Sequence, residues 1–434
     1  MMKNYLMLAV SAVCVLSASA AWDGTAQAWT KGDGSQASPY LIENEAHLAY
    51  FQQQVTAGES FAGKYIRLEN DLDMSGDNGQ KMLPIGFFDE YIDSSAPQGS
   101  TFIDDSKYFL GTFDGNFKVI DNIHIEYIAT DFEAVGGTGL FACLNDGAVV
   151  KNVGLGSKTV VTGGELTGSL VGQMNGGTLQ CCYSLATINS GSSFGTGGLV
   201  AVTSNDSKVD RCYFGGTVNG NSDVGGIVGT AQYGCKITNC YNKGTINAPN
   251  GWYVGGIIGS AYDTGTTVAN CYNIGVVNAE ESFLSKPEPI VGDAEYKVTV
   301  QNCYFLDNGK FEEASGVMKK SELEMKSDAM PTLLNGGSAD ANWQADSKNL
   351  NNGFPVLAWQ NDPSAGVVFS KTESLAVGVM NGAIYVHNVP AGAVVRVYSI
   401  LGTLVYEGSD SVIEMAQRGV YVVTVDNKVA KVRI

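Results

Sequence analysis

Short apolar runs separated by glycine, asparagine and aspartate recur between Gly136 and Gly309. Each unit has a pair of small residues with an apolar run, a turn-rich loop, a Val/Ile-x-x-Cys-Tyr run and a short Thr-Ile-Asn-type run. These runs have the length and the β-branched composition of strands and leave no room for a helix. The pattern therefore predicts three short strands in each unit.

The units follow one another at a nearly constant spacing. The cysteines of successive Cys-Tyr pairs, from Cys182 to Cys303, lie 30, 28, 31 and 32 residues apart. Units of this length cannot bury a hydrophobic face alone, so a constant period indicates stacked coils. We expect an all-β fold, a right-handed parallel β-helix with five to six coils between Gly136 and Gly309, because parallel crossovers are nearly always right-handed. Paired glycines at the corners would allow positive φ and close backbone approach.

The two residues of each Cys-Tyr pair should lie on opposite faces of their strand. Equivalent residues of adjacent coils are about 4.8 Å apart, so the cysteines would form an inward ladder of free thiols. A metal site is disfavoured because the repeats contain no histidine, and a chain of disulfides because stacked neighbours have poor disulfide geometry. Cys143, Cys181 and Cys235 lie outside the ladder, and a bridge among them is left open.

The tyrosines of the pairs would then point outward. A row of tyrosines at sheet spacing makes a flat aromatic face suited to sugars or to another protein. The alternative is that the rings stack on each other and shield the sheet. The candidate binding residues are Tyr183, Tyr213, Tyr241, Tyr272 and Tyr304.

Two short helical caps are predicted at the ends of the solenoid. Asn44 can N-cap a helix with Leu48, Phe51 and Val55 on one face, which would cover the open end of the coils. At the far end, Ser321-x-x-Glu324 is a capping box. A second helix is expected there from Asp328, with Pro331 in its first turn and Gly336 ending it.

The N-terminus and the charge indicate export. Lys3, the apolar run Tyr5 to Leu16 and Ala18-Ser19-Ala20 form a secretory signal peptide with its cleavage site. The net charge is −18 with only 26 Lys and Arg residues, which disfavours nucleic acid and anionic lipid as partners. No later stretch has the length of a transmembrane helix. We expect a location on the outer-membrane surface or outside the cell.

After a turn-rich linker the repeat gives way to alternating strands. Gly402 and Asp426-Asn427 supply turns, and about 70 residues are a plausible independent Ig-like antiparallel β-sandwich. The expected strands are Ala383 to Val386, Val394 to Tyr398, Thr403 to Tyr406, Val420 to Val425 and Lys428 to Ile434.

Two resemblances extend this interpretation. The tag Gly-Gly-Leu/Ile-Val-Gly followed by Asn-Cys-Tyr-Asn resembles the GLUG-repeat proteins of Bacteroidetes, and the flanks at 39–50, 84–86, 111–116 and 351–359 resemble that family's caps and first coils. The pattern at 397–402, 419–423 and 428–434 resembles the C-terminal sorting domain of the type IX (Por) secretion system. The second resemblance implies that the secretion machinery binds this domain during export.

Sites for catalysis are sparse in the sequence. β-Helix lyases and hydrolases need carboxylates that converge on neighbouring coils. The repeats contain few acids, and turn chemistry explains those that stand beside asparagine or glycine. The acids considered are Asp146, Glu165, Asp206, Asp210, Asp223 and Asp263. An acid-rich insertion is expected to be a solvated loop; it contains Asp89, Glu90, Asp93, Asp104 and Asp105. We assign no catalytic residue, cofactor or metal.

The sequence thus predicts an exported, surface-attached or secreted adhesin or binding module for glycan or protein ligands. A glycan-active β-helix enzyme and a structural surface spacer are the alternatives. The expected organisation is a signal peptide at 1–20, an N-terminal cap with first coils at 21–135, GLUG-like repeats at 136–309, a C-terminal cap at 310–360, a linker at 361–366 and the sorting sandwich at 367–434.

Overall fold

The structure is a computed structural model. It describes residues 22–76, 80–93, 101–128, 136–191, 194–281, 286–294, 298–337, 342–362, 377–380, 383–386, 393–399, 404–410, 412–414, 420–425 and 428–433. The chain divides into two compact units, Met1–Val367 and Val368–Ile434. The expected signal peptide and most of the expected linker lie outside the described residues.

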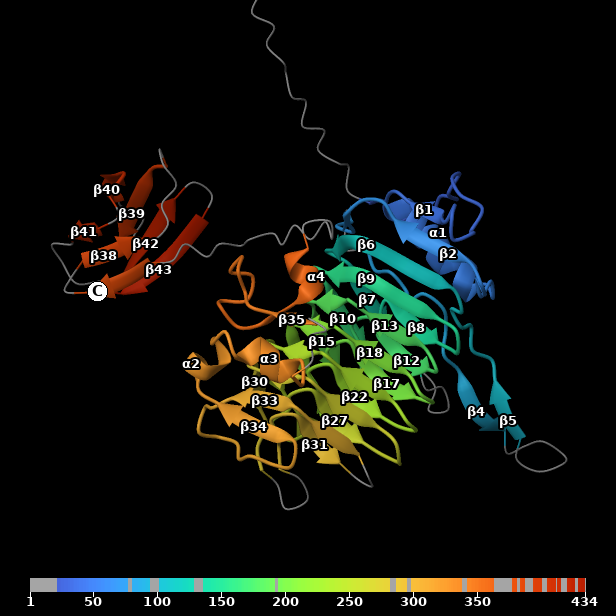
Figure 1. Cartoon of the computed structure of the whole chain (residues 1–434). Helices are drawn as coiled ribbons and strands as arrows, with labels where there is room; N and C mark the ends of the chain where they lie inside the picture. The colour runs from blue at the N-terminus through green and yellow to red at the C-terminus, as the bar shows by residue number, and fades with distance from the viewer. Residues whose placement is uncertain are drawn as a thin grey trace, which may run out of the picture. The chain divides into compact units, whose positions relative to one another are not determined.

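The first unit is a parallel β-solenoid, as predicted (Figure 1). Its longest sheet has sixteen strands. One row of that sheet contains β9 (Val149–Leu155), β13 (Thr178–Gln180), β18 (Lys208–Asp210), β23 (Lys236–Thr238), β28 (Thr267–Ala269) and β32 (Thr299–Gln301). The other row contains β14 (Tyr183–Ser184), β19 (Tyr213–Phe214), β24 (Tyr241–Asn242), β29 (Tyr272–Asn273), β33 (Cys303–Leu306) and β34 (Val317–Lys320). The first coils add β1 (Tyr40–Ile42), β2 (Tyr65–Leu68), β3 (Leu72–Asp73) and β6 (Thr112–Asp121).

Three further parallel sheets complete the coils. The second sheet contains β7 (His124–Tyr127), β10 (Val160–Gly163), β15 (Thr187–Ser190), β20 (Thr217–Asn219), β25 (Thr245–Asn247) and β30 (Val276–Asn278). The third contains β11 (Thr167–Gly168), β16 (Thr196–Gly197), β21 (Ser222–Gly225) and β26 (Trp252–Gly255). The fourth contains β8 (Phe141–Leu144), β12 (Val171–Asn175), β17 (Val200–Ser204), β22 (Val228–Ala231), β27 (Ile258–Ala261) and β31 (Val291–Ala294). Six strands in the fourth sheet agree with the expected five to six coils.

A complete coil has five short strands rather than the predicted three, as β20 to β24 show. The Val/Ile-x-x-Cys-Tyr run is divided in two by a residue with left-handed backbone conformation, such as Asn239 with φ 52°. Asparagine adopts this region more readily than most residues, which explains the asparagine before several Cys-Tyr pairs. Cys181 and Arg211 hold the same position in their coils, with φ 53° and 54°.

The apolar run is also divided, by a tight turn between the third and fourth sheets. A Cβ on Gly225 would lie 1.9 Å from the carbonyl oxygen of Val228, and Gly197 and Gly255 have the same close contact at 1.8 and 1.9 Å. None of these glycines has a positive φ. The sequence reasoning was therefore right about close backbone approach and wrong about positive φ at these positions.

One hydrophobic core fills the solenoid from Trp22 to Val317. Its cysteines stack in line as free, buried thiols, and the backbone N–H of Cys182 donates to Sγ of Cys212 at 3.4 Å. Burial raises the pKa of the Cys240 thiol. The predicted cysteine ladder is confirmed, and Cys143, Cys181 and Cys235 are free thiols as well.

A second ladder, of asparagine amides, follows the second sheet. Nδ2 of each residue donates to Oδ1 of the residue one coil earlier, at 2.9, 2.9 and 2.8 Å. Its members are Asn189, Asn219, Asn247 and Asn278.

The caps form where they were predicted. Helix α1 (Glu45–Thr56) begins after Asn44, whose side chain accepts a hydrogen bond from the His47 N–H at 3.0 Å. Its buried face includes Phe51, which packs on Phe113 with ring centroids 5.8 Å apart. At the other end, α2 (Glu322–Met325) has the predicted capping box, and α3 (Met330–Leu334) has Pro331 in its first turn.

The acid-rich insertion differs from the prediction. It forms an antiparallel hairpin of β4 (Glu90–Asp93) and β5 (Thr101–Asp104) rather than an unstructured solvated loop. Tyr108 stabilises it, since its hydroxyl donates to Glu90 at 2.8 Å and lies 3.2 Å from the Asp104 carboxylate, an alternative acceptor. Such cross-strand pairing outweighs the turn-like composition.

The second unit consists of two antiparallel sheets around its own core, which includes Val395, Val397 and Val423. One sheet contains β37 (Val377–Met380), β38 (Ala383–Val386) and β41 (Val412–Glu414). The other contains β39 (Val395–Ser399), β40 (Leu404–Gly408), β42 (Val420–Val425) and β43 (Lys428–Arg433). The five predicted strands are present to within a few residues at their ends.

Candidate functional site

The five predicted binding tyrosines lie outside the core, on the outer face of the long sheet, as alternation required. Successive rings of the first four are stacked, with centroids 4.9, 4.8 and 4.9 Å apart. All five are nevertheless at most 5% exposed. The tyrosines are Tyr183, Tyr213, Tyr241, Tyr272 and Tyr304.

A closing segment, residues 342–361, covers the first four of them: Trp359 stacks on Tyr183 and Tyr213, and Trp343 lies against Tyr241 and Tyr272. It contains β35 (Trp343–Gln344), β36 (Val356–Leu357) and α4 (Ala358–Asn361). Nε1 of Trp343 donates to the Asn270 carbonyl at 3.1 Å, and Nε1 of Trp359 to the Arg211 carbonyl at 2.9 Å. The expectation of an open tyrosine face is therefore wrong. The tyrosine rings bind the cap of the solenoid itself.

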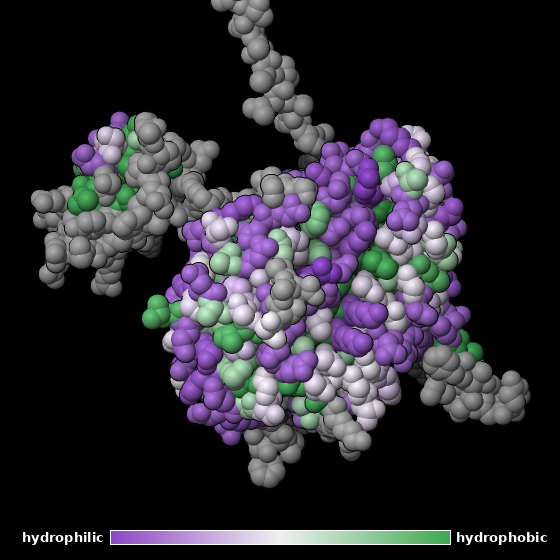
Figure 2. Space-filling model, viewed as in Figure 1, coloured by the Kyte–Doolittle hydropathy of each residue, from purple (hydrophilic) through white to green (hydrophobic). Residues whose placement is uncertain are grey.

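Exposed aromatic side chains occur elsewhere, at the edge of the solenoid where the strands of the third sheet start and the strands of the fourth sheet end. We call Trp252, Tyr253, Tyr233 and Tyr262 the aromatic surface. Trp252 is 47% exposed and Tyr233 54% exposed, and the other two are half-buried. The face in view in Figure 2 is mostly hydrophilic or neutral, with hydrophobic residues in small separate patches.

The turns of the coil place these aromatic residues at one edge of the solenoid. β26 runs from Trp252 to a turn at 256–257, and β27 returns from that turn to the loop that holds Tyr262. Tyr233 follows β22, which pairs with β27 in register. The strand starts and the returning loops therefore lie at one edge of the solenoid.

Asp223 lies beneath this surface. It is only 4% exposed, and its Oδ1 accepts hydrogen bonds from the Tyr262 hydroxyl at 3.0 Å and from the Ser260 hydroxyl. Burial raises the pKa of its carboxyl group, and the two hydrogen bonds partly oppose that increase. The buried carboxylate fixes the Tyr262 ring and joins one coil to the next.

A second carboxylate, Asp293, lies two coils further along, in β31. Asp293 pairs in register with Ser260 of the preceding coil, and burial raises its pKa also. The charge of Asp293 contributes to the raised pKa of Asp223. Carboxyl groups with raised pKa values that interact with each other can take part in proton transfer.

Sequence reasoning missed this group because it assigned Asp223 to a turn. The residue lies inside β21 with φ 53°, and its equivalents one coil before and after, Gly195 and Tyr253, have φ 62° and 55°. An alignment of the coils on these left-handed positions would have placed Asp223 beside Tyr253. The sequence does not reveal that these positions are equivalent, because glycine, aspartate and tyrosine have no side-chain property in common.

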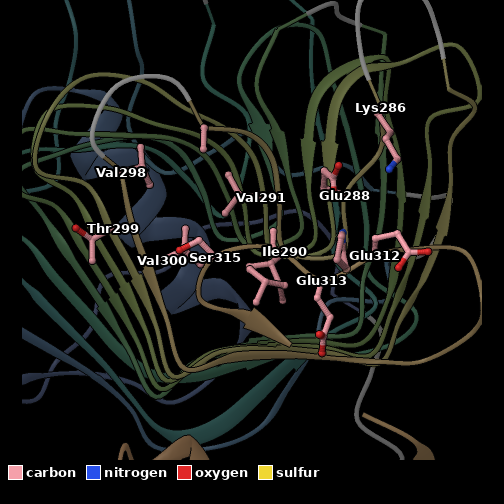
Figure 3. Close-up of a pocket in the computed structure, with 14 residues that line it drawn as sticks. Lys286, Glu288, Ile290, Val291, Val298, Thr299, Val300, Glu312, Glu313 and Ser315 are labelled. Carbon is pink, nitrogen blue, oxygen red and sulfur yellow. The ribbon is translucent and has the colours of Figure 1, made fainter. Parts of the chain in front are cut away.

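A cavity of about 580 Å³ opens at the far end of the solenoid (Figure 3). Ile290 and Val291 lie at its centre, and charged residues including Glu288 and Glu312 gather on one side. Lys310 covers part of this end, since its Nζ donates to the Val277 carbonyl of β30 at 2.7 Å. The cavity is the opening left by the last described coil.

Two absences concern the described part of the chain. No group of three or more His, Cys, Asp or Glu side chains there is arranged to hold a metal ion. No helix in that part has the length and hydrophobicity needed to cross a membrane.

Comparison with known proteins supports the repeat. Residues 220–247 match the family described as the GLUG motif. A 193-residue stretch is 32% identical to Halomucin of Haloquadratum walsbyi, which covers 44% of this chain but only 2% of that protein. The chain thus spans a very small part of that relative.

A solved structure has the same kind of fold. It is a candidate immunoglobulin A1 protease from Bacteroides ovatus, with a TM-score of 0.54 and 22% sequence identity, covering 78% of this chain and 97% of that one. At this identity the similarity concerns the fold. This chain is a β-helix repeat protein that contains a GLUG motif.

Proposed function

We propose that this protein is exported and acts at the cell surface or outside the cell as an adhesin or binding module, with glycans as ligands of the aromatic surface. The observation that carries the proposal is the row of exposed and half-buried rings at one edge of the solenoid, where the buried carboxylate of Asp223 holds Tyr262. Aromatic rings present flat apolar area together with polar edges, which suits the faces of sugar rings. The half-buried Tyr262 hydroxyl, which donates to the buried carboxylate of Asp223, can accept a hydrogen bond from a ligand next to the rings.

The rigid support of the surface favours binding. Tyr253 and Tyr262 come from strands and loops that are paired coil to coil, and Tyr262 is held by Asp223. Side chains held in place before binding lose little conformational freedom when a ligand arrives. A solenoid also repeats this edge from coil to coil, which suits an extended ligand.

Binding to a glycan array by the mature chain, from residue 21, tests this proposal. Trp252→Ala should weaken binding about tenfold or more, since a half-exposed ring that contacts ligand contributes roughly 1–2 kcal/mol. Leu323→Ala is the matched control, because Leu323 is 84% exposed and lies on α2. Equal glycan-array binding by the two variants would contradict the role of the aromatic surface. If the wild-type chain binds no glycan of the array, the alternative of a structural spacer is favoured.

A second candidate, a glycan-active enzyme, is favoured by the raised pKa values of Asp223 and Asp293. These carboxyl groups lie two coils apart, and the charge of Asp293 contributes to the raised pKa of Asp223. Polysaccharide cleavage by the wild-type chain, lost in Asp223→Asn and kept in Trp252→Ala, would support catalysis over binding. No product from any array glycan would oppose it.

Export is also part of the proposal. The signal-peptide pattern at 1–20 and the resemblance of 367–434 to type IX sorting domains support it, together with the similarity to a protein named Halomucin. Deletion of 367–434 should trap the protein in the periplasm while the melting temperature of 21–360 changes little. Normal surface display of the shortened chain would contradict the sorting role, and loss of solenoid folding would show that the sandwich is a structural cap.

A further inference from the structure

A cavity of about 470 Å³ lies between the outer face of the long sheet and the caps. From the sheet it is lined by Lys243, Ile274 and Leu306, which follow or end the strands of successive coils. These coils are in register, since the Ile274 N–H donates to the Asn242 carbonyl at 2.9 Å. From the caps it is lined by Glu322, Leu350 and Asn352, among others.

Lys243 brings a positive charge without a direct ion-pair partner to this cavity. Its Nζ lies 5.2 Å from the ring centroid of Tyr213, a cation–π contact. Among the residues that the structure describes, no carboxylate is within ion-pair distance of this Nζ. Glu322, the carboxylate that lines the cavity, is already paired with Nζ of Lys326 at 2.6 Å. Burial lowers the pKa of Lys243, and the charge of Asp346, beyond ion-pair distance, partly opposes that decrease.

The position of the ammonium group is costly without a partner. A buried charge lacking a counter-ion is unfavourable, and a single well-placed anion offsets much of that cost. Ile274, Leu306 and Leu350 line the same cavity as Lys243. The anionic group that fits there therefore belongs to a small molecule with an apolar face. Glu322 disfavours anions with several charges.

We propose that this cavity binds the carboxylate of a small organic acid, with Lys243 as its counter-ion. The site shares no residue with the aromatic surface, so it goes beyond the glycan-binding role and does not depend on it. Two sources carry this chemistry, a sugar acid and the free C-terminal residue of a short peptide.

Calorimetric titration of the full mature chain distinguishes the sources. The probes are glucuronate with glucose as its neutral counterpart, and N-acetyl-leucine with N-acetyl-leucinamide. At least one acid should bind about tenfold or more tightly than its neutral counterpart, the difference expected of a charge-assisted hydrogen bond. Preference for glucuronate identifies a sugar-acid site, and preference for N-acetyl-leucine a peptide-terminus site.

Two variants check the residue. Lys243→Met keeps the length and apolar stem of the side chain, so it should fold normally and lose the preference for the acid. Lys236→Met, at an exposed lysine of the same coil, should leave binding unchanged. No acid binding at concentrations up to about 10 mM, equal binding of acid and neutral probes, or unchanged acid binding in Lys243→Met overturns the proposal. If Lys243→Met does not fold, the acid-against-neutral comparison on the wild-type chain still decides.

Discussion

Alanine at Gly225 should be severely destabilising, and the reason lies in the turn between β21 and β22. The added Cβ would lie 1.9 Å from the Val228 carbonyl oxygen, 2.7 Å from the Gly229 nitrogen and 2.9 Å from the Ile257 oxygen. All three atoms belong to the backbone, so no side chain can rotate away. Because a normal C···O contact is about 3.3 Å, the turn must open by more than about 1 Å.

The expected loss is large for one methyl group. Overpacking that is relieved by side-chain shifts costs roughly 1–3 kcal/mol, and a backbone shift belongs at the upper end or above. Opening the turn also weakens the coil-to-coil hydrogen bond from the Gly198 N–H to the Gly225 carbonyl, 2.9 Å long, which contributes about 1 kcal/mol. We expect Gly225→Ala to lower the free energy of unfolding by about 3 kcal/mol or more.

Urea unfolding followed by far-UV circular dichroism measures this effect. With an m-value of about 3 kcal/mol/M, the midpoint should fall by about 1 M. Gly191→Ala is the matched control: Gly191 is exposed, has no positive φ, and a Cβ there meets nothing within 4 Å. Its midpoint should stay the same or rise, since alanine restricts the unfolded chain by about 0.4–1 kcal/mol. Equal midpoints for the two variants would refute the close-packing explanation of the repeat glycines.

Three further predictions follow from the coils. Cys181→Asn should stabilise the chain by about 0.5–1 kcal/mol, because asparagine tolerates the left-handed conformation better than cysteine; a lower melting temperature would contradict this. Because burial raises the folded-state pKa of Asp223 above its ordinary value of 3.8, wild-type stability should fall as pH rises from that value through the folded pKa. Asp223→Asn should therefore melt at a higher temperature than wild type at pH 7 and at an equal temperature below about pH 3; a constant difference across this range would exclude the titration. In thiol titration without reductant, the eight cysteines of the mature chain should react only after denaturation, since all are free and buried, and missing thiols in denatured protein would reveal disulfides.

Much of the solenoid could be predicted from the sequence because each coil repeats the one before it. Constant spacing and side-chain alternation are local properties, so they were enough to place Cys182 and Cys240 in the core and Tyr241 on the opposite face. Capping signals are equally local, and α1 begins after Asn44 as its sequence predicts. The strands of the second unit followed from the same alternation.

The candidate sites depended on contacts between distant parts of the chain. Alternation shows which side of a sheet a tyrosine takes, but not that a segment about 120 residues later covers that side; the Tyr241 hydroxyl and the Gln360 side chain meet only in the folded chain. The same holds for Asp223 and Tyr262, which lie on successive coils, and for Lys243, which the caps enclose. The amino-acid sequence by itself determined the repeating unit and its core, because these need only neighbouring residues and one period. Which outer faces stay exposed was decided by tertiary structure, because burial there depends on chain segments that the repeat does not encode.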